Sequence, residues 1–148
     1  MDPQSPEFEA FERVLAEHRE LKGLLGKIDQ VFAERAATVA EVSDMLAQLG
    51  DRLVKHFATE EDGSYFGEAL LHAPQLVSKA NELLAQHPKM RLQANHMLVQ
   101  IRTSSENEDW WQKTRQLFLE FRTELLRHEN REDRMLQEAY GQDLGSHD

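Results

Sequence analysis

Two copies of a His-x-x-x-Glu motif stand toward opposite ends of the sequence, and both combine residue types that bind metal ions. The first copy is His56 with Glu60, and the second is His128 with Glu132. Residues four positions apart lie on the same face of an α-helix, so each motif would present an imidazole beside a carboxylate. Imidazole nitrogens and carboxylate oxygens suit divalent transition-metal ions. The two motifs therefore indicate a metal site built from at least two helices.

A single histidine precedes each motif at a similar distance along the chain. His18 lies 38 residues before His56, and His87 lies 41 residues before His128. The sequence thus divides into two halves of the same pattern. If four helices turn these residues toward one interior, four imidazoles and two carboxylates meet there. This composition predicts a two-metal site with the ligands His18, His56, Glu60, His87, His128 and Glu132.

The elements that would position these ligands are helices. Apolar residues recur at intervals of three and four through most of the chain, which is the period of an amphipathic helix. We expect helices over about residues 7–36, 39–61, 75–103 and 106–140, with a kink or a division of the third near Pro88, because proline removes a backbone donor and crowds the preceding turn. This pattern favours an all-α, antiparallel up-down-up-down four-helix bundle that forms a single domain over residues 1–148.

Both motifs continue apolar helix faces, and this placement favours a buried metal over the alternatives. Leu53 lies three residues before His56, and Leu125 lies three residues before His128. An exposed His–Glu pair would contribute only about 0.2–0.5 kcal/mol, whereas a glutamate on an apolar face is costly to bury without a partner. A metal cation is the simplest partner. A buried network of His–Glu hydrogen bonds is the alternative.

Composition excludes several classes of function. The formal net charge of −10 argues against nucleic acid and against an anionic membrane surface as partners, since both require basic patches. No apolar run approaches the roughly 20 residues that span a bilayer, and the first residues lack the layout of a secretory signal. The sequence has no cysteine, so disulfides and thiol catalysis are excluded. These features predict a cytoplasmic protein.

Several other residues are expected to have structural or solvent-facing roles. His96 lies nine residues after His87, half a helical rotation away, and should be exposed. Asp133 is assigned to a solvated face, and the tail from Gly141 to Asp148 is expected to fray. Thr38 and Glu41 have the spacing of a capping box, which predicts the start of the second helix.

The order and spacing of the six ligands resemble hemerythrin-like proteins with an HHE cation-binding domain, over nearly the whole chain. The resemblance implies an up-and-down four-helix bundle around a non-haem di-iron centre. The two glutamates, Glu60 and Glu132, would bridge the irons together with an oxo, hydroxo or water bridge. Each iron would also take two histidines, His18 and His56 for one and His87 and His128 for the other.

Two positions depart from the pattern of the oxygen-carrying members of that family. Arg91 stands where those proteins have a second histidine in the third helix, and Glu132 precedes Asp133, the position that matches their aspartate. With four histidines in place of five, the centre is either more open or completed by another side chain. The nearest candidates are Glu61, Glu129 and Tyr65.

The resemblance implies a protein that binds or senses oxygen, nitric oxide, peroxide or iron, with a partner protein or a homodimer as a further expectation. A di-iron enzyme that decomposes peroxide or oxidises ferrous iron is the first alternative. A helical scaffold without a functional metal is the second. Manganese or zinc in place of iron also stays open, because selectivity among these metals often reflects availability.

Overall fold

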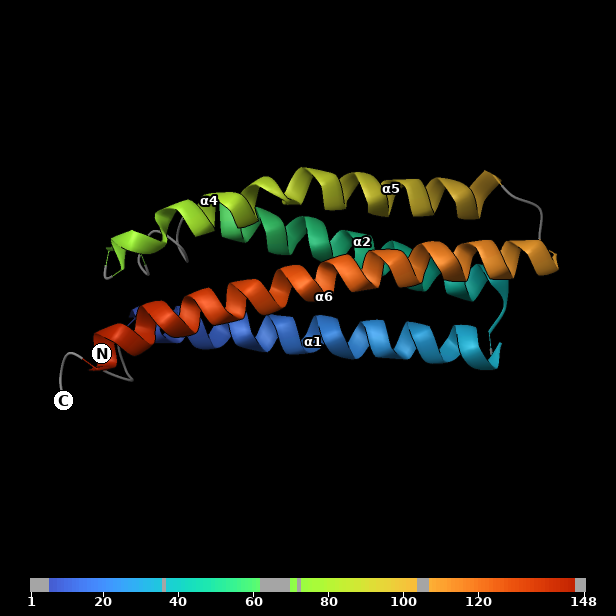
Figure 1. The fold of residues 1–148 in the computed structure, drawn as a ribbon. Helices are drawn as coiled ribbons and strands as arrows, with labels where there is room; N and C mark the ends of the chain where they lie inside the picture. Colours follow the sequence, from blue (N-terminus) through green and yellow to red (C-terminus); the bar gives the residue numbers. More distant parts are fainter. Residues whose placement is uncertain (1–5, 36, 62–69, 72, 104–106, 146–148) are drawn as a thin grey trace.

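The computed structural model describes residues 6–35, 37–61, 70–71, 73–103 and 107–145 (Figure 1). Its long helices are α1 (Pro6–Glu34), α2 (Val39–Glu61), α5 (His87–Thr103) and α6 (Glu108–Gly145). A 3₁₀ turn, η1 (Pro74–Leu76), and a shorter helix, α4 (Val77–Ala85), precede α5. The described residues contain no β-strand. The all-α class predicted from the sequence is therefore confirmed.

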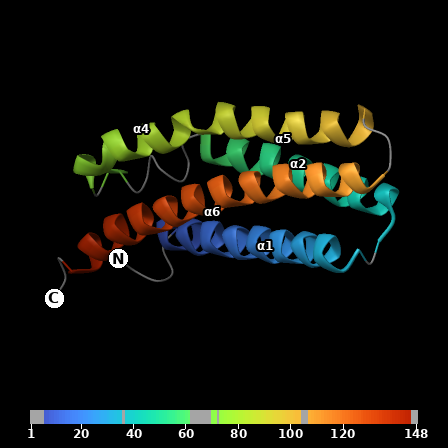
Figure 2. The same cartoon turned by 45° about the vertical axis from the view of Figure 1, so that its right-hand side comes forward.

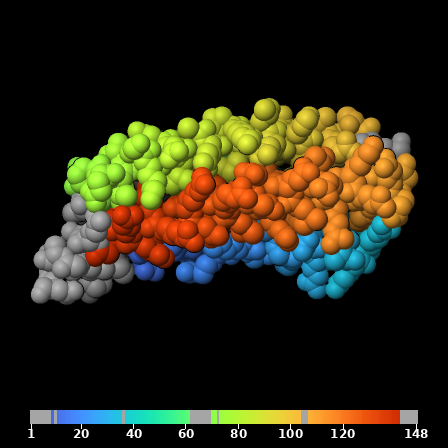
Figure 3. All heavy atoms as spheres, in the orientation of Figure 1, coloured from blue at the N-terminus to red at the C-terminus, as the bar shows by residue number. Residues whose placement is uncertain are grey.

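The long helices lie lengthwise beside one another, and each of them packs against two others. α1 contacts α2 and α6, and α5 also contacts α2 and α6, so the four form a closed ring around a common interior. Figure 2 shows the same neighbours from a second direction. In Figure 3, α6 covers the front of the molecule between α4 and α5 on one side and α1 on the other. In the part of the chain that the structure describes, no helix has both the length and the apolar character needed to cross a bilayer.

The helix expected over residues 75–103 is divided into η1, α4 and α5. Gln86 joins α4 to α5 with right-handed helical backbone angles, and its N–H donates to the carbonyl of Leu83 at 3.1 Å. The division makes Pro88 the second residue of α5. The first N–H groups of a helix have no intrahelical acceptor, so the missing donor of proline costs nothing at this position. A kink angle at this point stays a prediction.

The start of α2 follows from side chains that satisfy its free backbone groups. The N–H of Glu41 donates to Oγ1 of Thr38 at 3.2 Å, and the N–H of Thr38 donates to Oε1 of Glu41 at 3.4 Å. This reciprocal pair is the predicted capping box.

The last helix differs from its expected bounds at both ends. Oδ1 of Asn107 accepts a hydrogen bond from the N–H of Trp110 at 2.9 Å, and this cap places the start of α6 at Glu108. At the other end α6 continues through Gly145. The last helix is therefore longer than the expected end near residue 140, whereas the frayed tail from Gly141 stays a prediction, and residues 146–148 lie outside the described part of the chain.

The interior consists of two apolar clusters with a polar layer between them. On α1, His18 lies between Val14 of the smaller cluster and Leu21 of the larger one. On the third helix, His87 lies between Leu83 and Met90 in the same way. The larger cluster reaches toward the Trp110 end of the bundle and the smaller one toward the α4 end. The predicted ligands thus form a layer across the middle of a hydrophobic core.

Candidate metal centre

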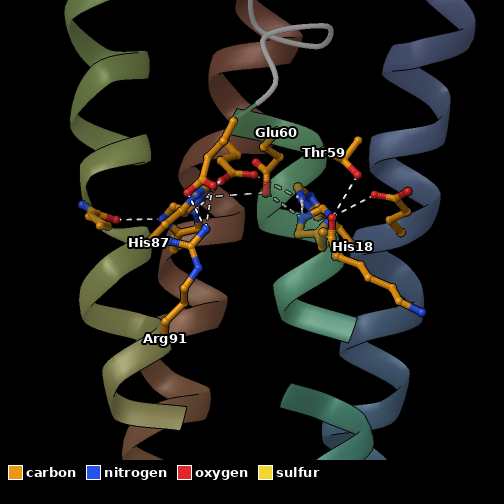
Figure 4. Close-up of polar contacts among 12 residues, drawn as sticks. His18, Thr59, Glu60, His87 and Arg91 are labelled. Carbon is orange, nitrogen blue, oxygen red and sulfur yellow. Dashed lines mark hydrogen bonds and ion pairs between the residues drawn. The ribbon is translucent and has the colours of Figure 1, made fainter. Parts of the chain in front are cut away.

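The structure brings all six predicted ligands together in the polar layer. One comes from α1, two from α2, one from the first residue of α5 and two from α6, and all six are buried, with exposed fractions between 0% and 6%. Figure 4 shows Glu60 between a group that contains His18 and a group that contains His87. The exposed position of His96 on α5 is confirmed as well.

The six residues form two overlapping sets that are each suited to one ion. His18 and His56 form the first set with the two glutamates, and His87 and His128 form the second set with the same glutamates. In each set the ligand atoms lie within 4.8 Å of one another. Because Glu60 and Glu132 belong to both sets, their carboxylates are placed to bridge two neighbouring ions.

The imidazoles of each set meet through their Nε2 atoms. Nε2 of His18 lies 3.1 Å from Nε2 of His56, and Nε2 of His87 lies 3.2 Å from Nε2 of His128. Two ligand atoms that bind one ion at about 2.1 Å and at right angles lie about 3 Å apart, so these separations fit a shared metal.

The opposite nitrogen of each imidazole in the first set faces a carboxylate. Nδ1 of His18 lies 2.6 Å from Oδ1 of Asp133, and Nδ1 of His56 lies 2.8 Å from Oε2 of Glu17. A carboxylate accepts a proton donor, so Nδ1 carries a hydrogen and Nε2 is the ring nitrogen that faces the interior. The assignment of Asp133 to a solvated face is therefore wrong, because its carboxylate faces inward to His18.

The imidazoles of the second set have the same orientation but different partners. Nδ1 of His87 lies 3.1 Å from Oε1 of Glu61, and Nδ1 of His128 lies 2.8 Å from the amide oxygen of Gln86. Glu61 also receives two hydrogen bonds from Nη2 of Arg91, at 2.5 and 2.6 Å. Glu61 thus faces Arg91 and the outer edge of His87, and it belongs to neither of the two ligand sets.

These four outer partners follow a rule along the chain. Each is the immediate sequence neighbour of a predicted ligand, and each pairs with the imidazole of the next helix around the bundle. Glu17 of α1 pairs with His56 of α2, and Glu61 of α2 pairs with His87 of α5. Gln86 of the α4–α5 junction pairs with His128 of α6, and Asp133 of α6 pairs with His18 of α1, which closes the cycle. These four outer partners were not predicted from the sequence, although each stands next to a predicted ligand in the chain.

The two glutamates of the layer are buried without conventional hydrogen bonds. Oε1 of Glu60 lies 2.9 Å from Nε2 of His56, and Oε2 of Glu132 lies 3.2 Å from Nε2 of His18. Neither carboxylate has a hydrogen-bond partner of good geometry among the described residues. Buried ionised carboxylates are costly unless they are paired or bind a metal. With four inward Nε2 atoms beside them, these carboxylates fit a pair of divalent cations.

When no metal is bound, protons must supply the positive charge that offsets the buried carboxylates. Burial alone would lower the pKa of His18, but Asp133 and Glu132 outweigh it and raise the pKa to about 10. Burial is likewise outweighed at His56, where Glu60 and Glu17 raise the pKa to about 9. In the second set burial dominates and lowers the pKa of His128 to about 3. The metal-free layer therefore holds its protons mainly on the His18–His56 side.

Of the three candidates for completing the coordination, Glu129 is buried and Tyr65 lies outside the described residues. Glu129 is fully buried on α6, and neither carboxylate oxygen has a hydrogen-bond partner in the described part of the chain. Burial raises its pKa to about 7, with His18 and His56 as its main electrostatic partners. It lies outside the two ligand sets but adds a carboxylate on the His18–His56 side.

Two narrow hollows reach the edge of the layer. One of about 330 Å³ lies between α1 and α2, and its walls include His56, Glu17, Lys55 and Thr59. The other, of about 140 Å³, reaches His128. The smaller one is large enough for water or a molecule of a few atoms, and the larger one is large enough for a bigger molecule.

Comparison with known proteins gives a family match over most of the chain. The model of the family described as hemerythrin HHE cation binding domain matches residues 9–140. No curated protein and no solved structure matches the chain.

Proposed function

The chain belongs to the hemerythrin HHE cation-binding domain family, and from this membership we propose that it is a non-haem di-iron protein that binds or senses a small ligand. The observation that carries the proposal is the pair of ligand sets that share Glu60 and Glu132. Imidazole and carboxylate ligands suit iron, and the two carboxylates together with an oxo, hydroxo or water bridge would offset part or all of the charge of two divalent ions. Manganese or zinc would fit the same ligands.

In this proposal His18 and His56 hold one ion, and His87 and His128 hold the other. The outer partners fix each ring with its Nε2 atom inward, so the ligands are already oriented before a metal arrives. The apolar clusters on both sides exclude bulk water from the layer. A pair of irons held by these residues would supply reversible redox chemistry for the binding of a small molecule.

A binding or sensing role is favoured by the openings to the layer and by the residue types within it. The hollows at His56 and His128 give oxygen, nitric oxide or peroxide a way to the edge of the layer. Among the described residues, the buried polar residues of the layer are the six predicted ligands and Glu129, and none of them is a hydroxyl or thiol nucleophile. Stoichiometric binding of a small ligand therefore accounts for the site more simply than turnover does.

The test is reaction of the reduced, iron-loaded protein with one gas at a time. We expect nitric oxide or oxygen to change the visible absorption spectrum in proportion to the protein concentration. Exposed His96 provides a matched control, since His96→Ala should leave this change intact. Catalytic decomposition of many equivalents of peroxide, without a stable spectral change, would instead assign the protein to the di-iron enzymes.

Other expectations remain part of the proposal. The antiparallel up-down-up-down order is supported by the course of the chain in Figure 1, where the colours run along successive helices in alternating directions. The single domain, the cytoplasmic location and a partner protein or homodimer remain predictions. A nucleic-acid or membrane-surface partner is not expected, because of the net charge of −10.

A further inference from the structure

The outer partners of the imidazoles differ in charge between the two ligand sets. His18 and His56 each donate to a carboxylate, Asp133 and Glu17. Among the described residues, no lysine or arginine forms an ion pair with either carboxylate. A carboxylate that accepts from Nδ1 raises the electron density of the ring and strengthens its Nε2 as a ligand. Both imidazoles of the first set therefore have enhanced basicity.

The second set lacks this enhancement on both imidazoles. The partner of His128 is the neutral amide of Gln86. The partner of His87 is Glu61, but Arg91 binds both of its carboxylate oxygens and neutralises its charge. The arginine also lies 5.7 Å from the centre of the Phe57 ring, and that ring stacks on His87 at 4.0 Å. A fixed positive charge is thus held close to the second set.

The surroundings of the two sets show the same difference. Glu129 places a further buried carboxylate on the His18–His56 side. The hollow at His128 is instead lined by three basic side chains and one acidic one, Lys89, Arg127, Arg131 and Glu124. The hollow at His56 has two of each, Arg52, Lys55, Glu17 and Glu20. The charges around the first set therefore favour a bound cation more than those around the second set do.

We propose that the two metal positions are unequal, so that the His18–His56 position fills first and keeps its ion, whereas the His87–His128 position holds an exchangeable ion. This inference rests on the proposed metal-binding function. Loss of an outer partner lowers metal affinity by about 10- to 100-fold in comparable sites. Since both outer partners differ in effective charge, we expect the two dissociation constants to differ by about 100-fold or more.

The test is an anaerobic titration of the metal-free full chain with Co²⁺ alone. Calorimetry and visible absorption monitor the binding. The expected result is two separate steps of one ion each. Asp133→Asn removes the charge beside His18 and should weaken the first step by about 10-fold or more, with the second step unchanged. Gln86→Glu adds a charge beside His128 and should strengthen the second step by a similar factor.

Two control variants carry the same charge changes away from the layer. Asp109→Asn alters an exposed residue near the start of α6, and Gln48→Glu alters an exposed residue of α2. Both should reproduce the wild-type titration. Two equal steps in the wild type, or a weaker second step in Asp133→Asn, would overturn the inequality. Binding of no Co²⁺ by the wild type would overturn the proposed function itself, so the two failures are distinguishable.

Discussion

Replacement of His56 and Glu60 together by alanine tests whether α2 is a ligand helix. Both side chains are buried, at 6% and 0% exposure, and Glu60 belongs to both ligand sets. The double variant leaves the first set with only His18 and Glu132, and the second set with three ligands. We therefore expect the metal content to fall from about two ions per chain to less than one.

The stability change follows from the lost binding free energy. A ligand at 100 times its dissociation constant stabilises the folded state by about 2.7 kcal/mol. For a domain of this size, about 1 kcal/mol changes the melting temperature by roughly 2–4 °C. The metal-loaded wild type should therefore melt about 5–11 °C above the double variant.

Thermal denaturation with and without a chelator separates this effect from lost packing. With excess chelator the wild type loses its bound metal and keeps its buried carboxylates, so the difference in melting temperature should shrink or reverse. The exposed His96→Ala variant should match the wild type in both conditions. Full metal content in the double variant, or an undiminished difference under chelator, would refute this reasoning.

The remaining predictions concern protons, packing and capping. Metal loading at pH 7 should release at least two protons per chain, one each from His18 and His56, whose pKa values are about 10 and 9 in the metal-free state. Affinity should accordingly rise with pH up to about 10, where the second of these two imidazoles loses its proton; a calorimetric signal independent of buffer ionisation would contradict this. Phe57→Ala removes a fully buried ring and should lower the free energy of unfolding by about 3–5 kcal/mol in denaturant titrations, and a loss under 1 kcal/mol would contradict that packing role. Thr38→Ala breaks the capping box and should cost about 0.5–2 kcal/mol in the same assay without changing the metal content.

The sequence alone was sufficient to predict the helical class and the convergence of the six residues because both depend on periodicity; that the six bind metal stays a prediction. A histidine and a glutamate four residues apart on an apolar face can only point inward together, and the structure places all six in one layer. Pro88 predicted a kink or a division in the third helix, but it did not identify Gln86 as the residue at which the helix divides.

The outer partners could not be assigned from periodicity because they depend on how neighbouring helices are rotated and spaced. Asp133 is one residue beyond a ligand, and on an isolated helix that position faces sideways, toward water. In the bundle the same direction faces His18 on α1. Glu17 and Glu61 are similar cases, since each reaches an imidazole on the next helix. Their polar character was visible in the sequence, but their partners were set by packing.

Elemental analysis of the purified protein shows most directly whether the six residues hold a pair of irons. We expect about two irons per chain, with near-ultraviolet absorption that bleaches on reduction. The matching control is His96→Ala, which should contain the same amount of iron. No bound metal, and no uptake during anaerobic reconstitution with ferrous iron, would contradict the account and leave a buried network of His–Glu hydrogen bonds in a helical protein.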